Sequence, residues 1–226
     1  MSIIRGSSFA ASVADSGTTR SCALLRFSGL GTESSPLRIS SILRHADFAD
    51  ESDLHTRLVE TEQSLTAMQT ALSEIEVPSK LPPDEHLKEV LEVANDTART
   101  TTAYYSAALA MKSGSELVVA GIGNLKLWRR CESELRAELE PTILTLPNQP
   151  ANAAVLTATL GIGFNPEKIQ ASTIKLGIGD FAVIAMETDL VQPLAGFQHF
   201  DSPEQLLNQV LRRLSNESPM TLVITG

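Results

Sequence analysis

The sequence predicts a single α+β domain with a mainly antiparallel β-sheet. Three observations support this prediction: short apolar stretches are separated by turn residues in the first 40 residues, a helical period of apolar residues follows, and further β-like runs complete the chain. A chain of 226 residues, 42% of them hydrophobic, can bury a core without disulfides or a structural metal. Because no change of composition divides the chain, we expect one domain over residues 1–226.

Three strands are expected before the helices. Residues 9–14 and 22–27 are apolar, and residues 15–17 between them favour two strands joined by a turn. Residues 29–36 are typical of a loop, and residues 37–43 predict the third strand.

Two helices follow these strands. The first is expected to begin near Asp53 and to end before Pro78, because apolar residues recur at helical spacing between them. The second begins after Pro82-Pro83 and presents one apolar face. Residues 100–102 are threonines, whose β-branched side chains favour a strand, so the next strand is expected from residue 101.

The middle of the chain predicts three consecutive strands. Residues 101–111, 116–120 and 125–130 are β-like, and the turn sequences at residues 112–115 and 121–124 separate them. This pattern indicates an antiparallel meander.

The C-terminal part predicts three strands and one helix. Residues 174–176 and 181–186 flank a turn in which Asp180 is expected to accept backbone N–H bonds. Ser202 and Gln205 have the spacing of a helix cap, and apolar residues continue that helix through Leu214. Residues 220–225 predict the last strand.

Composition and missing motifs exclude several classes of function. A net charge of −9 argues against nucleic-acid binding and against docking to an anionic membrane. The only cysteines are Cys22 and Cys131, so a disulfide framework is excluded and a reduced, cytoplasmic setting is expected. No apolar run has the length of a signal-peptide core or a membrane span. Phosphate-loop, nucleophile-elbow and zinc-protease motifs are absent, and the Gly-Ile-Gly triplets at 121, 161 and 177 are predicted to be turns.

A series of short motifs extends over most of the chain. In chain order they are Ala46-Asp47-Phe48 after an early strand, Gly121-Ile122-Gly123-Asn124 before a strand ending at Arg129, Gly179-Asp180 before a strand ending in Met186-Glu187-Thr188, and Ser218-Pro219-Met220-Thr221 before the last strand. In this order they resemble the metal-dependent protein phosphatase family, protein phosphatase 2C. The resemblance implies an α+β fold of two stacked antiparallel β-sheets flanked by helices.

The resemblance also implies a site, and the chain departs from the family at most of its positions. Active members hold two Mn²⁺ or Mg²⁺ ions, which activate a bridging water for attack on phosphoserine or phosphothreonine. Asn124 and Ser218 each stand in place of an Asp, and Pro219 stands in place of an Asn. Thr188 and Phe48 stand in place of glycines. In the segment after Arg20, residues 21–23 are Ser21, Cys22 and Ala23, so the acids of the family are missing there. Asp47 and Glu187 remain as candidate metal ligands, both vestigial, and no catalytic residue is predicted.

The number of carboxylates left at the site determines whether it can hold two metal ions. Two divalent cations about 4 Å apart repel each other by roughly 17 kcal/mol at an effective dielectric near 20, so a two-metal site needs several carboxylates. Asp47 and Glu187 are too few. The sequence therefore predicts no cofactor and a pseudophosphatase that acts as a regulatory or protein-binding module, with a kinase or a phosphoprotein as its partner.

Two alternatives remain open. Residues 50, 51 and 53 are acidic and follow Asp47, and Asp189 follows Glu187. A shifted set of acids would give a weak or atypical Mn- or Mg-dependent protein phosphatase acting on phosphoserine or phosphothreonine. The other alternative is an unrelated α+β domain that carries Gly-Asp turns, which a structure without two stacked antiparallel sheets would establish.

Overall fold

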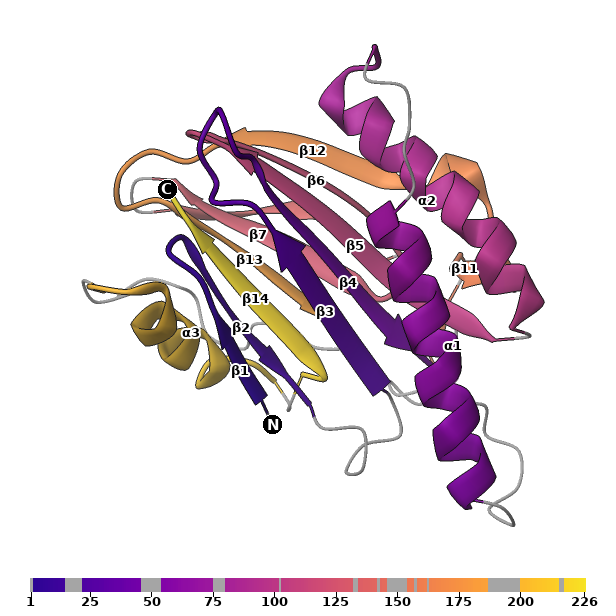
Figure 1. Cartoon of the computed structure of the whole chain (residues 1–226). Helices are drawn as coiled ribbons and strands as arrows, with labels where there is room; N and C mark the ends of the chain where they lie inside the picture. The colour runs from indigo at the N-terminus through magenta and orange to yellow at the C-terminus, as the bar shows by residue number, and fades with distance from the viewer. Residues whose placement is uncertain are drawn as a thin grey trace.

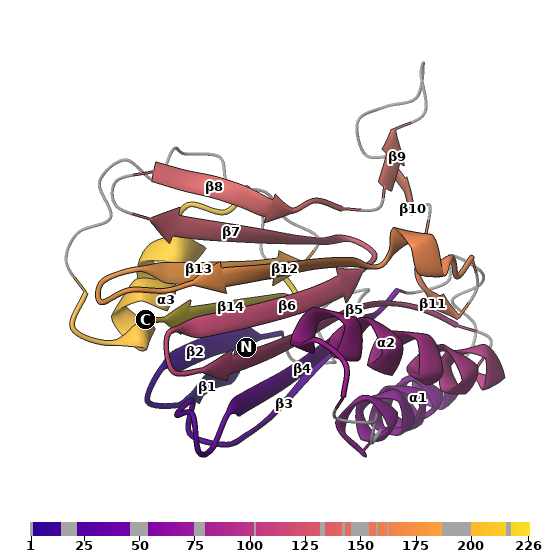
Figure 2. The ribbon, with the colours of Figure 1, turned by 90° about the horizontal axis from the view of Figure 1, so that it is seen from above.

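Two antiparallel β-sheets stack face to face, and helices cover both outer faces (Figures 1 and 2). The computed structural model describes residues 2–14, 22–45, 54–74, 80–101, 103–131, 134–141, 143–145, 154–156, 158–161, 163–186, 200–215 and 218–226. The predicted fold class, two stacked antiparallel sheets flanked by helices, is confirmed. The alternative of an unrelated domain without this arrangement is wrong.

The first sheet, sheet I, contains strands from both ends of the chain. Its order is β1 (Ser2–Arg5), β2 (Phe9–Val13), β14 (Met220–Thr225), β13 (Phe181–Met186), β7 (Leu125–Cys131) and β8 (Glu134–Leu139). Helix α3 (Pro203–Leu211) packs on its outer face against β2 and β14. The N-terminal and C-terminal strands are therefore neighbours in space.

The second sheet, sheet II, has the order β12 (Gln170–Lys175), β6 (Glu116–Ile122), β5 (Tyr104–Ser113), β4 (Leu37–Arg44) and β3 (Cys22–Ser28). The short β11 (Leu160–Gly161) also pairs with β5. Helices α1 (Leu54–Glu74) and α2 (Pro83–Thr100) cover its outer face, and the 3₁₀ turn η1 (Pro166–Lys168) precedes β12. A separate hairpin of β9 (Ile143–Thr145) and β10 (Ala154–Leu156) extends from the body (Figure 2).

The alternation of side chains along each strand produces three apolar layers. On β5, Ala108 and Ala110 face the core between the sheets, whereas Ala107 and Leu109 face the helices. A third cluster joins α3 to sheet I through Leu206, Leu207 and Val210. Since both faces of β2, β5, β6, β13 and β14 are largely buried, these strands are mainly apolar and their sequences alone do not reveal the partner strand.

One predicted strand pairing is wrong, although the strands themselves are confirmed. The predicted meander holds for β5 and β6, but β7 lies in sheet I, so residues 123–124 carry the chain from one sheet to the other. Strands β2 and β3, whose predicted turn lies outside the described residues, also lie in different sheets, as do β12 and β13 around residues 177–180. Short turns between antiparallel strands suggest hairpins, yet here they connect stacked sheets because both sheets bury apolar faces against each other.

The threonine run is helical in its first half, contrary to the sequence prediction. Thr100 lies in α2, and the strand begins only at Tyr104. The hydroxyls of Thr100 and Thr101 donate to the carbonyl oxygens of Thr97 and Ala98, each at 2.7 Å. These bonds let β-branched residues end a helix, because the side chain satisfies carbonyl groups of the last turn.

Several short elements were not predicted from the sequence. They are β1, β8, β9, β10, β11, the turn η1 and the first residues of β12. Most are edge or two-residue to four-residue elements with charged or exposed positions, which give weak alternation. Asp53, near which the first helix was expected to begin, lies outside the described residues. None of the helices in the described ranges combines the length and apolar character that a membrane crossing requires.

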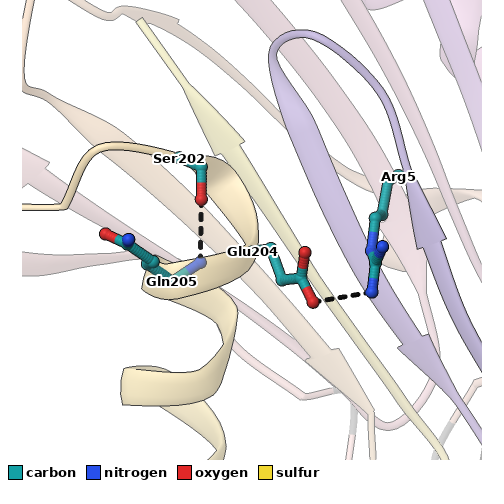
Figure 3. Close-up of polar contacts among 4 residues, drawn as sticks. All are labelled: Arg5, Ser202, Glu204 and Gln205. Carbon is teal, nitrogen blue, oxygen red and sulfur yellow. Dashed lines mark hydrogen bonds and ion pairs between the residues drawn. The ribbon is translucent and has the colours of Figure 1, made fainter.

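The start of α3 is fixed by one cap and one ion pair (Figure 3). The Ser202 hydroxyl accepts the Gln205 backbone N–H at 3.3 Å, as the cap spacing predicted. The Gln205 side-chain oxygen accepts from Asp201 N at 2.9 Å, so its bond reaches one residue further back than in a standard capping box. Arg5 on β1 contacts Glu204 at 2.7 Å.

We expect the cap to contribute more to stability than the ion pair. Ser202→Ala is expected to lower the free energy of unfolding by about 1 kcal/mol, the usual loss when a serine cap is removed. Arg5→Ala is expected to change it by less than about 0.5 kcal/mol, since the arginine side chain is 61% exposed and water screens the pair. Urea denaturation of both variants measures the two values, and a larger loss for Arg5→Ala would contradict this order.

Candidate functional site

Strand ends from both sheets meet at one edge of the sandwich, which we call the site edge. In sheet I, Met186 pairs with Met220 and Leu125, and Met220 pairs with Val13. In sheet II, β4 ends, β5 begins and β6 ends at this same edge, and residues 123–124 link it to β7. The chain therefore reaches the site edge immediately before each of the two candidate metal ligands.

The structure brings the described parts of the predicted motifs together, and the two candidate ligands lie outside the described residues. Asp47 follows His45 by two positions, and Glu187 follows Met186 directly. Asn124 and Ser218, which were matched to aspartates in the motifs of the resembled family, are both described at the site edge. The acids at positions 50, 51, 53 and 189 also lie outside the described residues.

A buried polar cluster occupies the sheet II side of the site edge. Ser106 is completely buried, and its hydroxyl lies 2.7 Å from the His45 Nε2 atom. The same hydroxyl accepts the backbone N–H of Asn124 at 2.7 Å. The His45 ring stacks on Tyr104, with centroids 5.6 Å apart. These contacts fix the direction in which β4 and β6 leave the sheet.

Gly123 makes this cluster possible. Its φ of +101° suits glycine, and a Cβ atom placed there would lie 2.2 Å from the Ser106 hydroxyl oxygen and 2.7 Å from the Ser106 Cα. The Gly-Ile-Gly triplet at 121 was predicted to be a turn, but Gly121 and Ile122 belong to β6 and only Gly123 lies in the turn. Its second glycine lets the backbone of the following residue, Asn124, approach Ser106.

Ser218 forms the sheet I side of the site edge. It is 3% exposed, and its hydroxyl oxygen lies 2.7 Å from the carbonyl oxygen of Met186 and 2.6 Å from that of Met220. A hydroxyl has one proton to donate, so these two carbonyls share it. Pro219 follows and uses its carbonyl to accept the Ala14 N–H at 2.9 Å. Both residues therefore satisfy backbone groups of neighbouring strands.

The described residues at the family's metal positions do not fit a two-metal centre. Mg²⁺ and Mn²⁺ prefer carboxylate and other oxygen donors, whereas Ser218 is a neutral proton donor engaged with carbonyl oxygens and Pro219 has no side-chain donor atom. Within the described ranges, no three His, Cys, Asp or Glu side chains converge as metal ligands.

Two other charged residues of interest lie at the opposite edge of the sandwich. Asp180 accepts the Gly177 backbone N–H at 2.9 Å, which confirms the role predicted for it in the turn. Lys112, near the end of β5, is 7% exposed, and burial lowers the pKa of its ammonium group. Neither residue contributes to the site edge.

Sequence reasoning missed Ser106. Its only sequence signal is a small polar residue inside an apolar strand, and such residues are common without any functional meaning. Its partners His45 and Asn124 are 61 and 18 residues away in the chain, so only the sheet register shows the cluster.

Comparison with known proteins identifies relatives by structure and not by sequence. No protein-family model matches the sequence, and no curated protein matches it. The S. agalactiae serine/threonine phosphatase aligns with 97% of this chain and 98% of its own, with a TM-score of 0.66 and 11% identity. The Mycobacterium tuberculosis serine/threonine phosphatase PstP/Ppp aligns over 90% and 97%, with a TM-score of 0.55 and 14% identity.

A third similar structure is PppA of Pseudomonas aeruginosa, described as a key regulatory component. It aligns with 92% of this chain and 98% of its own, with a TM-score of 0.53 and 13% identity. In each case nearly the whole of both chains takes part, so the similarity covers the entire sandwich and its flanking helices. The chain has the fold of the bacterial protein phosphatase 2C-type serine/threonine phosphatases, as its motif order predicted.

Proposed function

We propose that the protein is a pseudophosphatase, a domain with the protein phosphatase 2C fold that acts as a regulatory or protein-binding module. The observation that carries this proposal is the Ser218 hydroxyl, which stands at a metal-binding Asp position and instead bonds to the carbonyl oxygens of Met186 and Met220. A neutral donor in this place cannot offset the charge of a metal ion.

The rest of the site edge supports the same proposal. Asn124 replaces a second Asp, and its backbone is fixed by the buried cluster with Ser106 and His45. Asp47 and Glu187 are then the acids left for two ions that repel each other by roughly 17 kcal/mol at an effective dielectric near 20. Two carboxylates supply too little negative charge, so we propose that no metal cofactor is used.

A domain that keeps this fold without the metal chemistry can still bind a protein, so we propose a protein partner. PppA, which has the same fold, is described as a regulatory component, and this supports a regulatory role for the present chain. We propose a kinase or a phosphoprotein as the partner class, because a surface shaped for phosphoproteins can recognise them without hydrolysis.

Manganese titration and a phosphatase assay test the proposal together. Calorimetric titration of the full chain with MnCl₂ is expected to show no binding of two ions at micromolar concentration. Phosphoserine and phosphothreonine peptides are expected to show no hydrolysis under conditions in which the S. agalactiae phosphatase is active. The physical reason is the shortage of carboxylates around the ions.

The variant Asp47→Ala/Glu187→Ala serves as the control for contaminating activity. Turnover that the double variant keeps comes from another protein in the sample or from the acids at positions 50, 51, 53 and 189, and changing these four to Ala as well separates the two sources. Two-ion binding together with turnover that the double variant loses would overturn the pseudophosphatase proposal and establish the weak phosphatase.

A further inference from the structure

A cavity of about 260 Å³ lies between sheet II and the two helices that cover it. Strands β3, β4 and β5, the last part of α1 and the first part of α2 form its walls; Figure 1 shows these elements side by side. The strand residues that line it come from the end of β3, the start of β4 and the end of β5. The cavity is therefore at the far end of sheet II from the site edge.

The lining of this cavity is apolar below and cationic at its rim. Leu72, Leu87 and Val90 from the helices and Leu109 from β5 form buried apolar walls. The charged or titratable side chains that line it are Arg26, Arg38 and His86. None of the described residues that line it is acidic, in a chain whose net charge is −9.

The two arginines share one face of the sheet. Arg26 pairs with Ser40, and Arg38 pairs with Ser28, so the arginines are diagonal neighbours on adjacent strands. Leu25 and Ile39 alternate with them and face the core between the sheets, which places both arginines on the helix side. Diagonal neighbours lie within reach of long side chains. Two guanidinium groups can therefore contact one anion together.

Both arginines are exposed, and among the described residues neither has a carboxylate partner. Two like charges held close together repel each other, and a bound anion removes that repulsion. Guanidinium groups bind carboxylate and phosphate groups through paired N–H donors. The rim is thus suited to an anionic group, and the apolar walls are suited to a neighbouring apolar side chain.

We propose that this cavity is a docking site for an acidic segment of a protein partner. An apolar side chain of that segment fills the cavity, and an adjacent carboxylate or phosphate group contacts Arg26 and Arg38. The volume is below the roughly 300–1,000 Å³ typical of sites that enclose a whole small molecule, so it fits one or two side chains of a larger partner. This inference rests on the proposed protein-binding function and assigns that function a surface.

Selection from a phage library of random nine-residue peptides tests the docking site. The full wild-type chain, kept in EDTA, is expected to select peptides in which Asp or Glu stands next to Leu, Met or Phe. A synthetic selected peptide is expected to bind Arg26→Glu/Arg38→Glu at least about 10-fold more weakly than wild type, and its affinity is expected to fall with added salt. Backbone amide shifts of Ser40, Leu87 and Val90 locate the peptide.

The matched control is Lys168→Glu/Arg212→Glu, which changes the net charge by the same amount at exposed residues outside the cavity. It is expected to bind the peptide like wild type. A peptide with Gln for Glu is expected to lose binding, and one with phosphoserine for Glu shows whether phosphate or carboxylate is preferred. Absence of acidic enrichment, or equal loss of affinity in both double variants, would overturn the docking site.

The outcome is independent of the phosphatase assay. Peptide docking accompanied by metal-dependent turnover would overturn the pseudophosphatase proposal and keep the docking site. Absence of selective docking without turnover would overturn the docking site alone.

Discussion

Ser218→Asp, which restores the acid of the resembled family, is expected to lower the free energy of unfolding by about 3–5 kcal/mol at pH 7, the usual cost of an uncompensated buried charge. The reason is local geometry. The Ser218 side chain is 3% exposed and faces the carbonyl oxygens of Met186 and Met220, which accept its proton. A carboxylate in this position has no proton to donate and is repelled by both oxygens.

The loss of stability in Ser218→Asp is expected to grow as the pH rises. Burial and the two carbonyl oxygens raise the pKa of the introduced carboxyl above that of an unfolded aspartate, about 3.9. The unfolded chain then releases this proton at lower pH than the folded chain, so the deficit relative to wild type grows as pH rises above about 4. Urea denaturation at pH 4 and pH 7 measures the difference.

Ser218→Asn is the matched control, because an amide has the shape of the carboxyl group and can donate to a carbonyl. It is expected to be more stable than Ser218→Asp at pH 7 and to show no such pH dependence. The same measurement with MnCl₂ tests the function. Stabilisation of the wild-type chain by Mn²⁺ would show that the site edge holds a metal, contrary to the pseudophosphatase proposal, whereas stabilisation of Ser218→Asp alone would show that the missing carboxylate is what excludes the metal.

Gly123→Ala is expected to lower the free energy of unfolding by about 3–5 kcal/mol, from the combined cost of a strained φ and of broken hydrogen bonds. The φ of +101° is unfavourable for alanine, and the new methyl group would lie 2.7 Å from the Ser106 Cα and Cβ atoms. Ser106 must move, and its contacts with His45 and Asn124 are lost.

Gly163→Ala measures the cost of a strained φ without the cost of broken hydrogen bonds. Gly163 has a φ of +78°, but a Cβ atom there meets nothing within 4 Å. Gly163→Ala is therefore expected to lower the free energy of unfolding only by the cost of the strained φ, about 1–2 kcal/mol. Urea denaturation of both variants gives the comparison, and equal losses would mean that the packing of Gly123 on Ser106 has no measurable value.

The elements of this protein were largely predictable from local patterns. Apolar residues at helical spacing gave α1 and α2, and the Ser202 cap gave the start of α3. Strands β5, β6, β13 and β14 were predicted as short apolar runs within a few residues of their bounds. Edge strands such as β1 and β8 were missed, because charged and exposed positions weaken their pattern.

The pairing of the strands was not predictable from the same patterns. Residues 121–124 were predicted to form a hairpin turn, yet residues 121–122 belong to β6, and residues 123–124 join β6 in sheet II to β7 in sheet I. An apolar strand buried on both faces carries no mark of its partner, so the pairing depends on which faces pack together. The stacking of two sheets was predicted instead from the order of the motifs, which resembles that of a family with two stacked sheets.

The sequence by itself determined the helices, most strands and the turn role of Asp180, and it showed Asn at position 124 and Ser at position 218 where the resemblance implies acids. Only the tertiary structure decided what the replacing residues do. Ser106, His45 and Asn124 meet because β4, β5 and β6 end at one edge, and Ser218 satisfies carbonyl groups because β13 and β14 are paired there. Hydrogen bonds of this kind depend on distances of about 3 Å between residues far apart in the chain, and those distances are set by packing.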